Sequence, residues 1–86
     1  MNAKFAKVIS TWIENIGVGN DTELADNVRL DEIGADSLDC VELEISIEEE
    51  YNISFKLNDY CSETKPIGSI TLGEISEIIK RKTSEK

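Results

Sequence analysis

The chain has 86 residues, of which 40% are hydrophobic and 31% charged, and its formal net charge at neutral pH is −9. This length predicts one small domain spanning residues 1–86, because a second hydrophobic core does not fit in so short a chain. The acidic excess argues against nucleic acid and against an anionic membrane surface as partners, since both require basic patches.

The excess negative charge is concentrated in the middle of the chain. Residues 20–59 contain thirteen acidic residues against Arg29 and Lys56, whereas the segments on either side each carry a net charge of +1. This distribution favours partners with basic surfaces, because electrostatic attraction speeds their encounter with the chain. Acidic residues also keep a small protein soluble, which accounts for part of the excess.

The absence of histidine removes further classes of function. Neither a Ser-His-Asp nor a Cys-His catalytic arrangement can form, and a zinc site would have to use cysteines and carboxylates. Cys40 and Cys61 have neither a metal-site nor a redox spacing, and no signal peptide or membrane span is recognisable. We therefore expect a cytoplasmic, monomeric protein whose thiols are reduced.

Residues 3–16 have the periodicity of an amphipathic helix. Hydrophobic side chains recur along this segment at steps of three and four: Phe5, Val8, Ile9, Trp12, Ile13 and Ile16. Gly17 follows the last of them and is typical of a C-terminal helix cap. We expect this helix to form part of the core, and we assign Trp12 to packing rather than to a ligand site.

Residues 17–36 show no sustained periodicity and are rich in Asp, Asn and Gly, so they are predicted to form a long loop. Isolated hydrophobic residues are expected to fix this loop to the core: Val18, Leu24, Val28, Leu30 and Ile33. The clustered carboxylates of the loop do not follow the spacing of an EF-hand. We therefore predict no dedicated metal site.

The stretch Gly34-Ala35-Asp36-Ser37-Leu38-Asp39 places a serine where the acidic loop turns into a second predicted helix, residues 37–51. Asp36 can act as the N-cap by accepting a hydrogen bond from a backbone N–H two or three residues later. Ser37 is then the first helical residue, and a phosphate esterified to its hydroxyl would lie at the positive end of the helix dipole. Most serines in such positions are merely polar surface residues, so the surrounding sequence decides between the two interpretations.

The surrounding sequence resembles a known family. The segment IGADSLDCVEL at residues 33–43 and its continuation IEEEY at residues 47–51 closely resemble the signature of acyl carrier proteins. The resemblance implies an all-α fold, a small four-helix bundle of three main helices and one short helix with a long first loop that delivers the serine. It also implies a carrier that is not an enzyme, with 4'-phosphopantetheine from coenzyme A attached to Ser37 between Asp36 and Leu38.

The predicted helix over residues 37–51 has more apolar surface than one core face needs. By the resemblance, Leu43, Ile47 and Tyr51 match core positions, whereas Val41 and Ile45 match positions that dock partner enzymes. Several acidic residues would surround this docking surface: Asp36, Asp39, Glu42, Glu48 and Glu49. In most helices such acids form only a solvated face. Beside the serine motif we interpret them as contacts for basic patches on partner enzymes.

Two positions on this helix depart from the family pattern. Glu44 lies where many members have an apolar residue, which indicates an altered face or a slightly rotated helix. Cys40 lies one turn after Ser37 on the same side of the helix, where a free thiol could be acylated or form a mixed disulfide. The simpler interpretation of Cys40 is a small side chain in place of the family's common threonine.

Residues 52–70 resemble the family least and are several residues longer than its common form. Three alternating apolar residues predict an extended segment: Ile53, Phe55 and Leu57. A short helix is expected to begin at Asn58 and to end by Thr64, since Pro66 disfavours its continuation. This region borders the groove that shelters the acyl chain in the family, so the insertion leaves the cargo open.

Residues 71–82 are predicted to form the final helix, which serves a structural role. Thr71 and Glu74 fit a capping box, and basic residues at positions 80–82 complement the helix dipole. The buried face is expected to contain Leu72, Ile75, Ile78 and Ile79. Residues 83–86 are expected to fray.

The sequence therefore predicts an acyl carrier protein of fatty-acid or related acyl biosynthesis. Its partners would be a phosphopantetheinyl transferase and the acyl-transferring and condensing enzymes that use the thioester-bound cargo. A specialised carrier for polyketide, peptidyl or aminoacyl intermediates is an alternative within the family. An unmodified helical module that binds a partner by helix-in-groove contacts is an alternative from another class. A serine hydrolase is disfavoured, because histidine and the Gly-x-Ser-x-Gly elbow are both missing.

Overall fold

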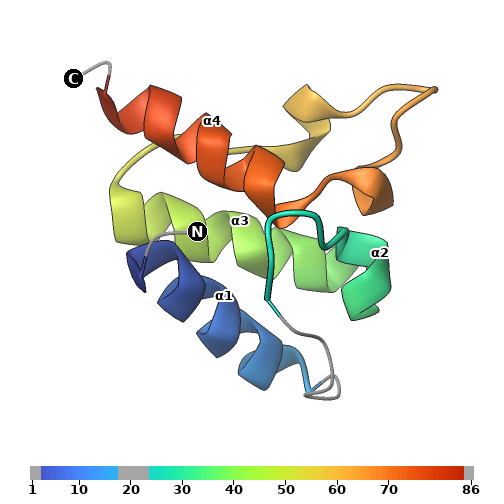
Figure 1. Cartoon of the computed structure of the whole chain (residues 1–86), viewed down its shortest axis with the longest axis horizontal. Helices are drawn as coiled ribbons and strands as arrows, with labels where there is room; N and C mark the ends of the chain where they lie inside the picture. The colour runs from blue at the N-terminus through green and yellow to red at the C-terminus, as the bar shows by residue number, and fades with distance from the viewer. Residues whose placement is uncertain (1–2, 18–23, 85–86) are drawn as a thin grey trace.

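The computed structural model describes residues 3–17 and 24–84. It contains four α-helices, α1 (Ala3–Ile16), α2 (Leu30–Ile33), α3 (Ser37–Tyr51) and α4 (Leu72–Ser84), and two 3₁₀ turns, η1 (Leu57–Tyr60) and η2 (Ile67–Ser69), as Figure 1 shows. The described residues form no β-strand, and the predicted all-α fold with three main helices is confirmed, although the described residues have more short helical turns than the one predicted. None of the helices within these ranges is long and apolar enough to cross a membrane.

The three main helices match their predicted ranges closely. Both α1 and α3 begin and end where the sequence pattern indicated, and Gly17 caps α1 in the left-handed region at φ +74°, with its N–H bonded to the Ile13 carbonyl at 3.2 Å. The prediction was wrong at the end of α4, which continues to Ser84. Thr83 donates a hydrogen bond to the Ile79 carbonyl at 2.9 Å, and the last described turn is held in this way.

The segment predicted as one long loop contains the short helix α2. A helix of four residues is not stable alone, and its formation here follows from the burial of Leu30 and Ile33 in the core. The backbone N–H of Arg29 donates to the Glu32 carboxylate at 3.0 Å at the start of this helix. Val28 is also buried, as expected, whereas Val18 lies outside the described residues.

The chain between α3 and α4 is ordered by two 3₁₀ turns rather than by one short α-helix. The predicted short helix is present as η1, which begins at Leu57, one residue earlier than expected. The chain then reverses at residues 62–65, where Ser62 and Lys65 exchange backbone hydrogen bonds of 2.8 and 3.1 Å. The second turn, η2, directly follows Pro66 and was not predicted.

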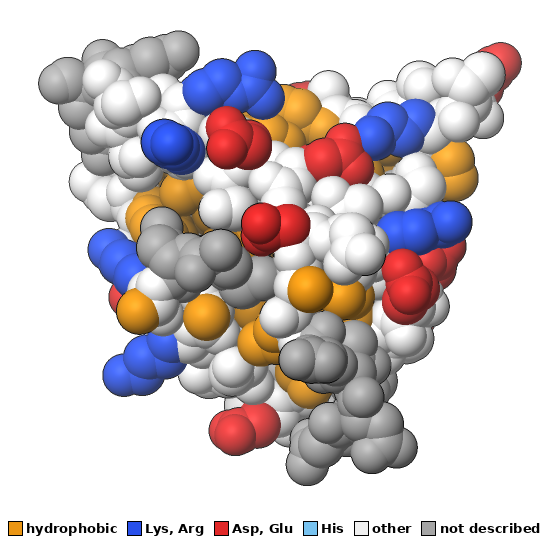
Figure 2. Space-filling model, viewed as in Figure 1, with side chains coloured by type: hydrophobic (Ala, Val, Ile, Leu, Met, Phe, Trp, Pro, Cys, Tyr) orange, Lys and Arg blue, Asp and Glu red, His pale blue; other side chains and the backbone are white. Residues whose placement is uncertain are grey.

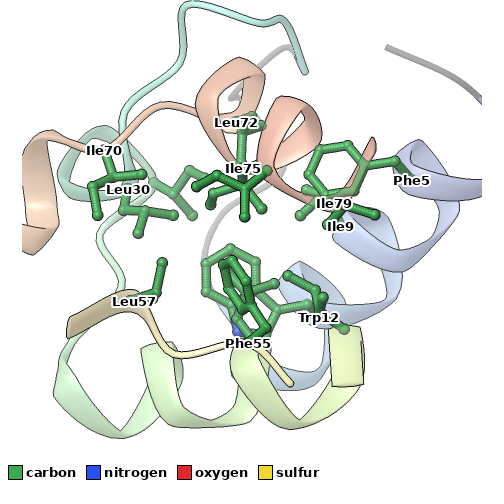
Figure 3. Close-up of a cluster of buried hydrophobic side chains, with 14 of the residues drawn as sticks. Phe5, Ile9, Trp12, Leu30, Phe55, Leu57, Ile70, Leu72, Ile75 and Ile79 are labelled. Carbon is green, nitrogen blue, oxygen red and sulfur yellow. The ribbon is translucent and has the colours of Figure 1, made fainter. Parts of the chain in front are cut away.

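The core lies among α1, α3, α4 and the segments that connect them. Figure 3 shows Phe55 and Leu57 in one cluster with Trp12 of α1 and with Leu72 and Ile75 of α4. Phe55 and Leu57 have no exposed surface, and the burial of such a side chain contributes about 1.5–3 kcal/mol. The segment after α3 is therefore an integral part of the core.

Three long-range contacts hold the segment that leads into α3. The Leu30 N–H donates to the Ile70 carbonyl at 3.0 Å, and the Leu72 N–H donates to the Val28 carbonyl at 2.9 Å. At Gly73 the chains approach so closely that a Cβ would come within 2.8 Å of the Asp26 carbonyl oxygen. These contacts join residues 26–30 to the start of α4, and they position α2 and the turn that precedes Ser37.

Candidate functional site

Ser37 is exposed at the first position of α3, and the turn that places it there is fixed by two aspartates. The Asp36 carboxylate accepts a hydrogen bond from the Asp39 N–H at 2.9 Å, which confirms Asp36 as the N-cap. The Asp39 carboxylate in turn accepts from the Asp36 N–H at 3.0 Å. Two backbone donors of the first turn are thus satisfied reciprocally. This capping role of Asp39 was not predicted, although an acidic residue three positions after an N-cap indicates a capping box.

The chain reaches Ser37 through a sharp turn at the end of α2. Gly34 has φ +86°, in the left-handed region that other residues adopt only with strain, and its N–H donates to the Asp31 carbonyl at 3.2 Å. Ala35 and Asp36 then lead directly into α3. The glycine of the motif therefore has a defined task, which is to end α2 within one residue and to direct the chain into α3.

The start of α3 is also bound to α1. The indole Nε1–H of Trp12 donates to the Asp39 carbonyl at 2.7 Å, across 27 positions of sequence. Trp12 was assigned to packing, and it is indeed almost completely buried. Its hydrogen bond adds a second task, because it fixes the first turn of α3 to the neighbouring helix.

A groove of about 570 Å³ opens beside Ser37. One wall is the side of α3 that starts at Ser37, and the other walls come from α2, the residues after it, η1 and η2. The lining residues are Leu30, Ala35, Asp36, Ser37, Cys40, Val41, Glu44, Asn58, Ile67 and Gly68. The groove is thus mostly apolar, and its polar lining residues are Asp36, Ser37, Glu44 and Asn58.

Glu44 lines the groove and also makes a hydrogen bond that stabilises the fold. Its carboxylate accepts a hydrogen bond from the backbone N–H of Leu57 at 2.6 Å and thereby holds η1 against α3. Sequence reasoning noted Glu44 as unusual but could not find this contact, because the two residues are thirteen positions apart. The polar residue is accommodated without helix rotation, since Leu43 and Ile47 are fully buried as predicted.

The thiol of Cys40 also lines the groove, half-buried and without a disulfide partner. Burial raises the pKa of this thiol, and the negative charges of Asp39, Glu44 and Asp36 raise it further. The thiol therefore stays protonated at neutral pH and is a poor nucleophile. This environment favours the interpretation of Cys40 as a small groove-lining side chain over that of an acylated or oxidised thiol.

The exposed face of α3 carries an apolar stripe. Leu38, Val41 and Ile45 expose 76%, 48% and 47% of their surface. Tyr51 is not part of this stripe. It was expected in the core and is half-buried beneath the ammonium group of Lys4. Such a row of exposed large apolar side chains on one helix is typical of a surface that binds a partner.

Acidic residues accompany this stripe, with one exception. Glu42 and Glu49 are exposed next to it, and Asp39 lies at its start. Glu48 instead faces the segment after α3, where it accepts hydrogen bonds from the Phe55 N–H at 3.1 Å and from Lys56 at 3.2 Å. These two donors hold the pKa of Glu48 below its ordinary value, the backbone N–H contributing most.

The acidic character of α3 is local. On the face shown in Figure 2, Lys and Arg side chains lie next to Asp and Glu side chains. The sequence of α3, by contrast, contains six acidic residues and no basic one.

Within the described ranges, no three His, Cys, Asp or Glu side chains are grouped so as to hold a metal ion, and the loop acids Asp21 and Glu23 lie outside those ranges.

Comparisons with known proteins agree on one family. The family described as "Phosphopantetheine attachment site" matches residues 6–79. An acyl carrier protein of Cyanidium caldarium is 47% identical over 47 residues, which cover 55% of each chain. An acyl carrier protein of Bdellovibrio bacteriovorus is 40% identical over 53 residues, which cover 62% of this chain and 68% of that protein. The match thus spans about half to two thirds of these relatives, and no solved structure matches the chain significantly.

Proposed function

Since the chain belongs to the acyl carrier protein family, whose members are carriers rather than enzymes and bind 4'-phosphopantetheine covalently, we propose that Ser37 is the residue that holds this arm. The terminal thiol of the arm supplies the chemistry, because acyl groups bound to it as thioesters stay activated for transfer. The chain itself presents the serine, shelters cargo beside it and binds the enzymes that use the cargo.

The observation that carries this proposal is the exposure of Ser37 at the N-terminus of α3, at the edge of the groove. The positive end of the helix dipole favours a phosphodiester at this position by about 0.3–1 kcal/mol. The hydrogen bonds between Asp36 and Asp39 keep the turn fixed while Ser37 stays accessible. A transferase can therefore reach the hydroxyl without unfolding the helix, and Leu38 beside it offers an apolar contact.

The exposed stripe of α3 supports a proposal for partner binding. Val41 and Ile45 would contact apolar patches on phosphopantetheinyl transferases and on acyl-transferring or condensing enzymes. Four acidic residues would meet basic groups around these patches: Asp39, Glu42, Glu48 and Glu49. The contribution of Glu48 is expected to be smaller than that of Glu42 or Glu49, because its carboxylate already binds Phe55 and Lys56.

We further propose that residues 1–86 act as one cytoplasmic carrier domain in fatty-acid or related acyl biosynthesis. A specialised carrier is a second candidate, and the specific observation in its favour is the ordered insertion that brings Asn58 and Ile67 to the groove. An unmodified interaction module would use the same exposed stripe but would need no arm on Ser37.

Mass spectrometry tests the attachment site directly. The protein is incubated with coenzyme A and a broad-specificity phosphopantetheinyl transferase, and its intact mass is measured before and after. We expect a gain of one phosphopantetheine, which peptide fragmentation assigns to Ser37. The Ser37→Ala variant should gain nothing while keeping the helical circular dichroism of the parent.

A matched control uses another exposed serine, Ser54, which lies beyond the end of α3. The Ser54→Ala variant should be loaded at the rate of the parent. Loading of folded Ser37→Ala would show that the site is wrong. A folded, previously unmodified parent that gains no mass would instead favour the unmodified interaction module.

A further inference from the structure

The groove beside Ser37 has a chemical direction along α3. Ser37, then Cys40 and Val41, then Glu44 lie along its wall at three successive turns of the helix. Glu44 comes seven residues after Ser37, which places it about 10 Å farther along the helix axis. The wall thus leads from the proposed attachment serine past apolar side chains to a carboxylate.

The carboxylate of Glu44 is fixed in position and has capacity to spare. One oxygen accepts the hydrogen bond of the Leu57 N–H, whereas an ionised carboxylate has about four acceptor sites. The side chain is half-buried, and none of the ion pairs between described residues includes it. Asn58 also lines the groove, and its amide oxygen already accepts from the Cys61 thiol at 3.7 Å.

This arrangement discriminates between cargoes by charge. A purely hydrocarbon chain that reached Glu44 would displace water from a carboxylate and give it no partner, which is unfavourable. A protonated amine at the same place would donate to the free acceptor sites of Glu44. The methylene groups between the thioester and the amine would contact the apolar lining at Leu30, Val41 and Ile67.

We propose that this groove takes a short acyl cargo that ends in a protonated amine, an aminoacyl group, which Glu44 recognises by charge. The inference rests on the proposed attachment at Ser37, and it favours the second candidate, a specialised carrier, over a carrier of purely hydrocarbon chains. Asp36 at the groove's other end and the absence of basic residues from its lining add to the attraction for a cation. Glu44 is thus a specificity-determining residue for the cargo.

The test compares two cargoes of equal length. Coenzyme A thioesters of ω-aminohexanoic acid and of heptanoic acid, in which a methyl group replaces the amine, are used with a phosphopantetheinyl transferase to load the protein. Cleavage of each thioester by hydroxylamine is followed by intact mass, and each rate is divided by that of the same free coenzyme A thioester. We expect the protein to slow cleavage of the ω-aminohexanoyl group about two- to fivefold more than that of heptanoyl, the range for a half-exposed ion pair.

Three variants assign this difference to Glu44. Glu44→Gln removes the charge but keeps an oxygen that can accept from the Leu57 N–H, so the fold is retained and the difference between cargoes should vanish. Glu44→Leu should slow cleavage of the heptanoyl group instead. Glu50→Gln removes the same charge from an exposed position of α3 outside the proposed docking residues and should leave the preference of the parent unchanged.

Equal protection of both cargoes on the parent protein would overturn the inference whatever the variants do. A loss of preference in Glu50→Gln as large as in Glu44→Gln would also overturn it, because general acidity would then explain the effect. Nuclear magnetic resonance gives an independent readout, since the Leu57 amide signal should shift with the amine cargo. An equal shift with the cargo-free arm would show that Glu44 binds the arm and would refute cargo recognition. Failure to attach any arm would count against the proposed function itself and is distinguished by mass.

Discussion

The two aspartates at the start of α3 hold its first turn by exchanging hydrogen bonds between side chain and backbone. Asp36 and Asp39 each accept from the other's backbone N–H at about 3 Å, so two donors that the helix cannot satisfy itself are paired. Their carboxylates also lie at the positive end of the helix dipole, which stabilises negative charge. The geometry of the proposed attachment site therefore depends on side chains that carry no chemistry of their own.

Removal of this cap should be measurable as a loss of stability. We expect Asp36→Ala to lower the free energy of unfolding by about 0.5–2 kcal/mol, the usual contribution of an N-cap side chain. Urea denaturation followed by circular dichroism measures the change. Glu63→Ala, which removes an exposed carboxylate from the loop between η1 and η2, should change the stability by less than about 0.5 kcal/mol. An Asp36→Ala variant as stable as the parent would contradict the capping role.

At the scale of elements, two glutamates of α3 connect this helix to the chain that follows it. Glu44 accepts from the Leu57 N–H at 2.6 Å, and Glu48 accepts from the Phe55 N–H at 3.1 Å. Since Phe55 and Leu57 are completely buried, these side chains satisfy backbone donors of a segment whose side chains belong to the core. The segment after α3 is thus held on this helix by polar contacts at its backbone and by apolar contacts at its side chains.

The contacts of Glu48 make stability depend on pH in the acidic range. The pKa of Glu48 is lowered in the folded protein by the Phe55 N–H and by Lys56, from an ordinary value of 4.5. A group whose pKa is lower in the folded state stabilises the fold above its unfolded pKa and loses this contribution as the pH falls through its folded pKa. The contribution of Glu48 is therefore complete above about pH 5 and decreases as the pH falls below 4.5.

We expect the free energy of unfolding of Glu48→Gln to depend less on pH than that of the parent between about pH 5 and pH 3. Urea titrations at a series of pH values measure both curves. Glu49→Gln is the matched control, because the neighbouring Glu49 is exposed and should leave the pH dependence of the parent unchanged. Parallel curves for Glu48→Gln and the parent would show that the contact with Phe55 does not contribute in solution.

At the scale of the whole molecule, the charge is divided between elements rather than spread evenly. The final helix α4 has Arg81 and Lys82 in its last turn, whereas α3 has no basic residue. In the proposed docking, a partner with a basic patch would be attracted to the helix that presents Ser37 and the exposed apolar stripe. Long-range attraction would orient the encounter, and apolar contacts with Leu38, Val41 and Ile45 would add affinity at short range.

The rate of arm attachment should therefore fall steeply with salt. Between about 0.01 M and 1 M salt the Debye length decreases from about 30 Å to about 3 Å, and we expect the second-order rate constant for modification by a transferase to fall about tenfold or more. Intact-mass measurement of samples quenched at a series of times, at low protein concentration, gives this constant. For a double variant, Glu42→Gln with Glu49→Gln, the rate constant at low salt should be smaller than that of the parent and should depend less on salt. A rate constant independent of salt would contradict steering by the acidic face.

The order of residues alone was enough to predict the helices α1 and α3, the N-cap Asp36 and the candidate serine. These features depend on interactions between residues at most about four positions apart, such as the apolar periodicity of α1 and the cap of α3, and local interactions of this kind are visible in the order of residues. The attachment motif is also contiguous. For that reason Ser37 could be singled out before any fold was known.

The helix α2, the groove and the hydrogen bond of Glu44 depend on contacts between distant segments and could not be predicted from the order of residues. The four residues of α2 have too little propensity to form a helix alone, and the burial of Leu30 and Ile33 stabilises it. The bonds from Trp12 to Asp39 and from Leu57 to Glu44 join residues 27 and 13 positions apart. Such pairings form because core packing brings the segments together, and the free energy of packing depends on the whole chain rather than on any one stretch of sequence.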